Sequence, residues 1–304
     1  MGSFKILVVG DGIIGLAAAW RLAASGHQVT CIGDNAPASS DAAAGMLAPS
    51  FERYHPRAAR DLGPLLDDGL AKWAGFAEAL AAEVGDTFGY QRNGITGIGF
   101  AGAPSERAVP CPPPDGFPAS RAWHVAGEGQ VDPRLLRRAL AKALVQRGGV
   151  RISSHVDQIE LRADNLCVRS HTSVFNADRI IIAGGFQATE LLSLNIPMEG
   201  VRGRAFLQHV PDLKLDHVVR TPTVYFCPKT EGQVYVGATE EAVKGEKASI
   251  EGLWWEAVSI CPALQGTKRV STFDGIRPAP LAGLPQVGHW AEDERVFLAF
   301  GHDR

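Results

Sequence analysis

The chain has 304 residues, of which 45% are hydrophobic and 21% charged, so it is long enough for one large or two interleaved domains and is neither disordered nor fibrous in composition. Its formal net charge of −3 gives no general attraction to phosphate backbones or anionic lipids. We therefore expect neither nucleic acid nor a membrane among its partners.

The cysteines are scattered, without the CxxC or CxxH spacing of a structural zinc site or a redox dithiol: Cys31, Cys111, Cys167, Cys227 and Cys261. They are typical of reduced thiols. The first apolar run is short and glycines interrupt it at once, which argues against a signal peptide or a membrane span. We expect a cytoplasmic protein without a metal site.

Residues 4–9 are apolar and β-branched, as in a strand, and they lead into the glycine-rich segment GDGIIG. The Ala-rich residues 14–25 predict a helix, with Gly26 in the position of a left-handed C-terminal cap. Residues 28–32 predict a second strand, and the length of the connection suits a parallel pair. The chain therefore begins with a β-α-β unit.

Further along, Asp132 and Pro133 mark the start of a helix that ends near Gly148. Helical patterns also cover residues 62–84 and 249–260, and strand patterns cover residues 150–161, 166–175, 178–183 and several segments within 201–238. Proline and glycine predict loops over residues 93–129 and 274–288. We expect an α/β fold in which a Rossmann-like domain is interleaved with a domain of antiparallel sheet and helix.

The spacing Gly10-x-Gly12-x-x-Gly15 allows a strand to turn tightly into a helix whose free N–H groups and dipole hold a pyrophosphate. Ile13 and Ile14 lie in the same turn. Because a strand precedes the motif and an Ala-rich helix follows it, dinucleotide binding is favoured over a tight turn without a ligand.

An acidic residue at the end of the second strand usually accepts the adenosine ribose hydroxyls. In chains with this fingerprint the acid usually falls one place earlier, where this chain has Gly33. Asp34 is therefore the candidate, reaching the ribose through a shifted loop. The alternative is a solvated aspartate in a turn.

Further segments follow in order: AAAGMLAP at residues 42–49, GEGQVDP at 127–133, VGATEE at 236–241, GIRP at 275–278 with GLP at 283–285, and GHDR at 301–304. Together with the fingerprint they resemble glycine oxidases of the D-amino-acid oxidase family. The resemblance implies noncovalently bound FAD, a small amino-acid substrate, O2 as electron acceptor and, for several members, a part in forming the thiazole of thiamine. A homo-oligomer is a further expectation.

The resemblance also implies roles for residues in the substrate pocket. Arg277 matches an arginine that pairs with the substrate carboxylate, which a guanidinium binds bidentately, and the alternative is a structural arginine before a proline. Tyr225 matches a pocket tyrosine or is a strand-core aromatic, and Glu240 falls where such a pocket has methionine. Arg304 matches a second arginine near flavin and substrate, at a position free to fray.

For the flavin, the resemblance places one loop beside the isoalloxazine: Ala43, Ala44, Gly45 and Met46. Val156 would contact the adenine side. The strand end at Ala183 and Gly184 would let the backbone approach FAD, unless the glycine is an ordinary turn residue. Gly301, His302 and Arg304 leave the last strand toward the cofactor, and His302 is expected to be structural rather than catalytic.

Two departures from the family pattern follow from the same comparison. We expect residues 100–129 to form a shorter segment without the family's usual helix. We also expect the helix that follows Arg304 in the family and closes over the flavin to be missing. The expected FAD-binding domain comprises residues 1–85, 130–198 and 272–304, and the substrate-binding domain comprises residues 86–129 and 199–271.

The reaction expected from the resemblance is hydride transfer from the substrate α-carbon to flavin N5. The lone pair of a neutral amino group assists the hydride's departure, so no dedicated acid–base residue is required. One alternative is another flavoenzyme of this fold: a D-amino-acid dehydrogenase, a sarcosine-type oxidase or a cyanide-forming glycine dehydrogenase subunit. The other is a truncated, non-catalytic remnant that only binds a nucleotide.

Overall fold

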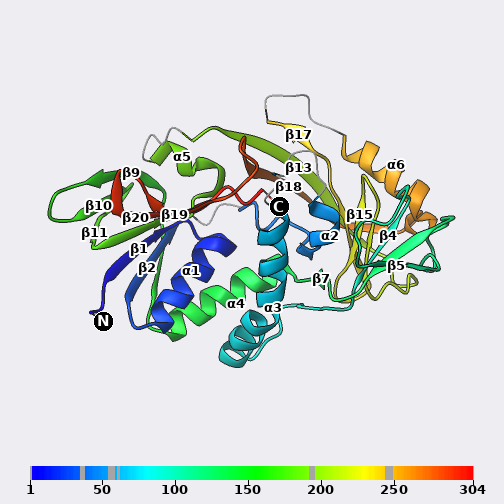
Figure 1. The fold of residues 1–304 in the computed structure, drawn as a ribbon, viewed down its shortest axis with the longest axis horizontal. Coiled ribbons are helices and arrows are strands. Elements are labelled where there is room, and N and C mark those ends of the chain that lie inside the picture. The colour runs from blue at the N-terminus through cyan, green and yellow to red at the C-terminus, as the bar shows by residue number, and fades with distance from the viewer. Residues whose placement is uncertain are drawn as a thin grey trace.

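The computed structural model describes residues 2–34, 38–53, 59, 62–191, 196–243 and 249–303. Two large sheets lie toward opposite sides of the molecule in Figure 1, and two long strands run between them, β13 (Met198–His209) and β18 (Lys268–Pro280). These two strands pair antiparallel along nearly their whole length. They cross both expected domain boundaries, near residues 198 and 271, so the residue limits of the domains stay a prediction.

The first sheet has six strands in the order β19-β20-β12-β1-β2-β8. All are parallel except the edge strand β19 (Gln286–Trp290). The parallel strands are β1 (Lys5–Val9), β2 (Gln28–Gly33), β8 (Val150–Ser153), β12 (Arg179–Ile182) and β20 (Asp293–Phe300). This order confirms the Rossmann-like expectation, and it brings the carboxyl ends of β1, β2, β12 and β20 to one edge, where ligands bind in such sheets.

Three helices cover one face of this sheet: α1 (Ile13–Ala24), α3 (Leu62–Val84) and α4 (Pro133–Gln146). The helices predicted over residues 62–84 and from Pro133 to near Gly148 are both confirmed. Gly26 follows α1 with φ of 88°, as predicted for the cap. The Asp132 carboxylate caps α4 by accepting the backbone N–H groups of the next turn. None of the described helices combines the length and apolar character needed to cross a membrane.

The opposite face carries a three-stranded antiparallel meander, through a core that includes Ile159, Leu166 and Val168. Its strands are β9 (Val156–Leu161), β10 (Leu166–Ser170) and β11 (Val174–Ala177), and the short helix α5 (Ala188–Leu191) packs beside it. The prediction of a single strand over residues 150–161 is wrong. That run divides at residues 154 and 155, because β8 joins the parallel sheet while β9 turns into the meander.

The second sheet has the order β17-β13-β16-β15-β14-β4-β6-β5, with β18 paired to β13. Its shorter strands are β4 (Ile95–Ile98), β5 (Ala108–Cys111), β6 (Ala122–Val125), β14 (Val218–Arg220), β15 (Tyr225–Pro228), β16 (Gln233–Gly237) and β17 (Glu241–Ala242). The helix α6 (Ile250–Ile260) packs on one face. The other face meets a segment containing α2 (Pro49–Glu52) and the two-stranded pair β3 (Met46–Leu47) and β7 (Gly129–Gln130).

Both proline-rich stretches predicted as loops contain strands, so that prediction is wrong. Residues 93–129 contain β4, β5 and β6, and the stretch that begins at residue 274 contains the second half of β18. Pro110 lies in β5, the terminal strand of its sheet, and Pro278 and Pro280 lie in β18, outside the main strand order. Proline lacks a donor but is tolerated on such edge strands, which composition alone does not reveal.

Candidate active site

The glycine-rich turn joins β1 to α1 at the carboxyl edge of the parallel sheet. A β-carbon added at Gly10 would lie 2.3 Å from the carbonyl oxygen of Ala183, and one at Gly15 would lie 1.9 Å from the carbonyl oxygen of Gly10. Internal packing therefore requires both glycines. At Gly12 the nearest described atom is Oγ of Ser40, at 3.4 Å. The space over Gly12 is thus open to a ligand.

The start of α1 offers backbone donors to such a ligand. The Ile13 N–H donates to Oγ of Ser40 at 3.2 Å, and the N-cap residue, Gly12, has no side chain that could accept the N–H groups that follow. Ile14 is exposed on the same turn. The remaining N–H groups of the helix start and the helix dipole fit the pyrophosphate of a dinucleotide.

The end of β12 lies directly beside this turn, since the Ala183 N–H donates to the carbonyl of Val9 at 2.7 Å. A β-carbon at Gly184 would make an ordinary contact at 3.5 Å with Ala188. Protein packing therefore does not demand glycine at this position. A small residue that the fold itself does not need is compatible with close approach of a cofactor.

The segment after β20 is fixed against β18. Gly301 has φ of 78°, a β-carbon there would lie 2.6 Å from the Pro280 ring, and the Asp303 N–H donates to the carbonyl of Pro278 at 3.1 Å. His302 is partly buried, and burial lowers its pKa, so the ring is neutral at physiological pH. Arg304 lies outside the described residues.

The loop of Ala43, Ala44, Gly45 and Met46 is held from both sides. Met46 pairs with Gln130, and the Val131 N–H donates to the Gly45 carbonyl at 2.9 Å, so the AAAGMLAP and GEGQVDP segments lie side by side. The Lys229 ammonium donates to the Ala44 carbonyl at 2.8 Å. The preceding residue, Ala42, accepts a hydrogen bond from the Tyr235 hydroxyl. The loop therefore lies between the two sheets.

The second strand ends in a corner that also contains the start of the meander. Asp34 is exposed, and its Oδ2 lies 3.4 Å from Nδ1 of His155. Val156, which follows His155 in the chain, is buried in the core of the meander. Asp34 and Val156 are thus brought together, at the carboxyl end of β2.

A cavity of about 440 Å³ opens beside the second sheet, and its lining includes Arg220, Tyr225, Thr239, Glu240 and Leu253. Tyr225 stacks on Tyr235, with ring centroids 6.4 Å apart. Burial raises the pKa of Tyr225 to about 12, an effect that the nearby Arg277 guanidinium opposes. The phenol therefore stays protonated and can donate a hydrogen bond. Glu240 is exposed at the cavity.

Arg277 lies on β18, opposite Val201 of β13, and its guanidinium covers the backbone of Gly203. A β-carbon added at Gly203 would lie 2.6 Å from Nη2 of Arg277. Among the described residues the guanidinium makes one long hydrogen bond, from Nη1 to the Thr239 carbonyl at 3.4 Å. A guanidinium has five N–H donors, so most remain available for a ligand.

A second arginine near Tyr225, Arg220, was not indicated by any sequence signal. It is 8% exposed, its Nε has no partner among the described residues, and its guanidinium carbon lies 5.5 Å from the Tyr225 ring centroid. Its Nη2 is 4.0 Å from a carboxylate oxygen of Glu52. Only the pairing of β14 with β15 places Arg220 beside the cavity, and no local motif marks it.

The parallel sheet, the open glycine turn and the adjoining loop define a dinucleotide-binding oxidoreductase architecture. The family model for FAD dependent oxidoreductases matches residues 5–304, and the chain belongs to this family. FAD is therefore the cofactor, and a β-carbon added at Gly12 or Gly184 would meet no described atom closer than 3.4 Å.

Among its relatives, the chain is 32% identical over 98% of its length to the bifunctional protein ThiO/ThiG of Synechocystis sp., of which it covers 48%. It is 28% identical over 99% of its length to the glycine oxidase of Pseudomonas putida, of which it covers 90%. The crystal structure of glycine oxidase from Geobacillus kaustophilus has the same fold, with a TM-score of 0.88 at 23% identity over 100% of this chain and 90% of that one. The chain thus spans about half the length of the bifunctional relative.

Proposed function

We propose that this chain oxidises glycine or another small primary or secondary amino acid. The observation that carries the proposal is the position of Arg277, whose guanidinium lies over Gly203 and near Tyr225, with most of its donors uncommitted to other described residues. An arginine so placed suits a carboxylate. The names of the Pseudomonas putida and Geobacillus kaustophilus relatives, both glycine oxidases, support the same substrate class.

The expected flavin loop and the substrate cavity are connected by direct contacts. The loop residue Ala42 accepts a hydrogen bond from Tyr235, Tyr235 stacks on Tyr225, and Tyr225 lines the cavity. A substrate held by Arg277 and Tyr225 would therefore lie close to the loop of residues 43–46. We assign carboxylate binding to Arg277, a supporting hydrogen bond to the Tyr225 hydroxyl, and contact with the amino group to Glu240.

FAD, when bound, supplies the hydride acceptor for the substrate α-carbon. The chain's own residues hold the carboxylate, orient the α-carbon and limit access of water. The amine loses two electrons and two protons as its C–N bond becomes an imine, and O2 that takes up both becomes H2O2. A neutral amino group provides its own lone pair, so His302 needs no part in proton transfer.

We further propose that the imine contributes to thiazole formation in thiamine biosynthesis, since several relatives bear the name ThiO/ThiG. We also propose that the enzyme is cytoplasmic. We also propose that the protein is a homo-oligomer. FAD contact is assigned to the loop of residues 43–46, Val156, Gly301 and His302. Arg304 keeps its predicted role beside flavin and substrate.

Oxygen consumption by the purified, FAD-loaded protein tests the choice of electron acceptor. With glycine, sarcosine and small D-amino acids as substrates, we expect one H2O2 for each O2 consumed. Turnover that requires an artificial acceptor, with no O2 uptake, would instead identify a dehydrogenase. No turnover with any acceptor, despite bound FAD, would favour the non-catalytic remnant.

A further inference from the structure

The glycine at the end of β2 is required by a neighbouring carboxylate. Gly33 is not among the described glycines with positive φ, so its backbone would accept any residue. A β-carbon added there would nevertheless lie 2.4 Å from Cγ and 2.4 Å from Oδ1 of Asp11. The Asp11 carboxylate therefore occupies the space in which a side chain at position 33 would begin.

Asp11 is the residue between the first two glycines of the fingerprint, and it is only 8% exposed. Two arginines hold its carboxylate: Nη2 of Arg137 lies 2.8 Å and Nη2 of Arg151 3.1 Å from Oδ2. Nε of Arg137 also donates to the Asp11 backbone carbonyl at 2.9 Å. Both side-chain contacts use Oδ2, and Oδ1 is the oxygen next to Gly33.

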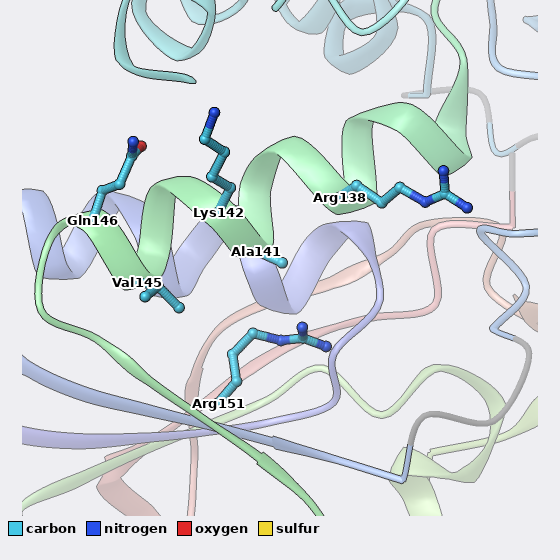
Figure 2. Close-up of a pocket in the computed structure, with 6 residues that line it drawn as sticks. All are labelled: Arg138, Ala141, Lys142, Val145, Gln146 and Arg151. Carbon is cyan, nitrogen blue, oxygen red and sulfur yellow. The ribbon is translucent and has the colours of Figure 1, made fainter. Parts of the chain in front are cut away.

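These arginines make an acidic side chain tolerable beside a pyrophosphate site. A carboxylate there would by itself repel the phosphates, but the guanidinium groups of Arg137 and Arg151 compensate its charge, although Arg137 also pairs with Asp41 at 2.7 Å. Arg151 lies on β8, next to α4. Together with Arg138 and Lys142 of that helix it lines a surface groove (Figure 2). The charge around Asp11 is therefore positive on the side of α4 and β8.

We propose that Asp11 is the carboxylate that accepts the vicinal hydroxyls of the adenosine ribose of FAD, in place of the acid expected at the end of β2. The Asp11 carboxylate lies at the carboxyl end of β2, in the space where a side chain at position 33 would begin. Asp34, the residue predicted for this role, is exposed and lies beside His155. The inference depends on the FAD requirement of the family and not on the identity of the substrate.

The test is a titration of the flavin-free protein with FAD and, separately, with FMN, which has the isoalloxazine but no adenosine. Asp11→Asn keeps the shape of the side chain, and Asp11→Gly removes it. We expect either change to raise the Kd for FAD by about 10- to 100-fold, the range for loss of charge-assisted hydrogen bonds. The Kd for FMN should change less than about 2-fold. Asp34→Asn is the matched control and should leave both constants unchanged.

Exchange of the two residues gives an independent test at constant net charge. Gly33→Asp alone should abolish FAD binding or folding, because its β-carbon meets the Asp11 carboxylate. The double variant Asp11→Gly with Gly33→Asp removes that collision and returns a carboxylate to the corner, so its Kd for FAD should return to within a few-fold of the original. The proposal is wrong if Asp11→Asn leaves the Kd for FAD unchanged, or if FAD and FMN are weakened equally, which would indicate a structural role.

Discussion

Replacing Gly12 with valine is expected to give a protein that folds but does not retain FAD. The backbone at Gly12 has φ of −69° and ψ of −179°, which a β-branched residue adopts readily, and the nearest described atom to its β-carbon is 3.4 Å away. The new side chain would fill the space left for the pyrophosphate. Because several hydrogen bonds of ~1.5–3 kcal/mol each would be lost, the affinity for FAD should fall by roughly 100-fold or more.

The matched variant is Gly15→Val, in the same motif. Its β-carbon would lie 1.9 Å from the carbonyl oxygen of Gly10, so this change should disrupt the β1–α1 turn itself. Circular dichroism and thermal unfolding of the flavin-free proteins, with visible absorption of the purified forms, separate the two effects. Full flavin occupancy in Gly12→Val would show that the pyrophosphate does not bind at this helix start.

Replacing Arg277 with alanine is expected to raise the KM for the amino-acid substrate by roughly 30- to 1,000-fold while leaving the flavin content unchanged. The range corresponds to ~2–4 kcal/mol for a substrate carboxylate left without its bidentate partner in a desolvated site. Arg277→Lys keeps the charge but not the paired geometry, so its KM should be intermediate. Steady-state kinetics on protein of equal flavin occupancy measures these effects.

Two further variants test whether the change in KM arises from the Arg277 guanidinium. Gly203→Ala introduces a β-carbon 2.6 Å from Nη2 of Arg277, which should displace that flexible side chain and raise KM without removing a charge. Arg202→Ala is the control, since Arg202 is already engaged with Asp274 at 2.8 Å. An unchanged KM in Arg277→Ala together with a raised KM in Arg202→Ala would transfer carboxylate binding to Arg202.

Local signals were sufficient to predict the first unit of the fold and the start of α4. A strand, a glycine turn and an Ala-rich helix in succession predicted the β1–α1–β2 unit, and the Asp132 cap predicted the start of α4. Each of these elements depends on neighbours within a few residues. The strands β4, β5, β6 and β18 were missed. β4 and β18 pair with strands that are distant in the sequence, and the prolines of β5 and β18 occupy edge positions.

The candidate site was predictable to the extent that its residues lie in motifs. The glycine turn, the loop at residues 42–46 and Arg277 were identified in this way. Arg220 was missed because no motif surrounds it, and Asp11 because the expected acid was sought at the end of β2. What relates Asp11 to Gly33 is a contact between the glycine-rich turn and the end of β2, and only the folded chain shows it.

Anaerobic addition of glycine to the FAD-loaded protein, followed by visible absorption, tests the central claim most directly. Oxidation of the amino acid must transfer two electrons to the flavin, so its visible bands should bleach in a single turnover without O2 and recover when O2 is admitted. The account predicts bleaching in the unmodified chain, and in Arg277→Ala only at much higher glycine concentration. Flavin bands that glycine, sarcosine and small D-amino acids all leave unchanged would contradict it.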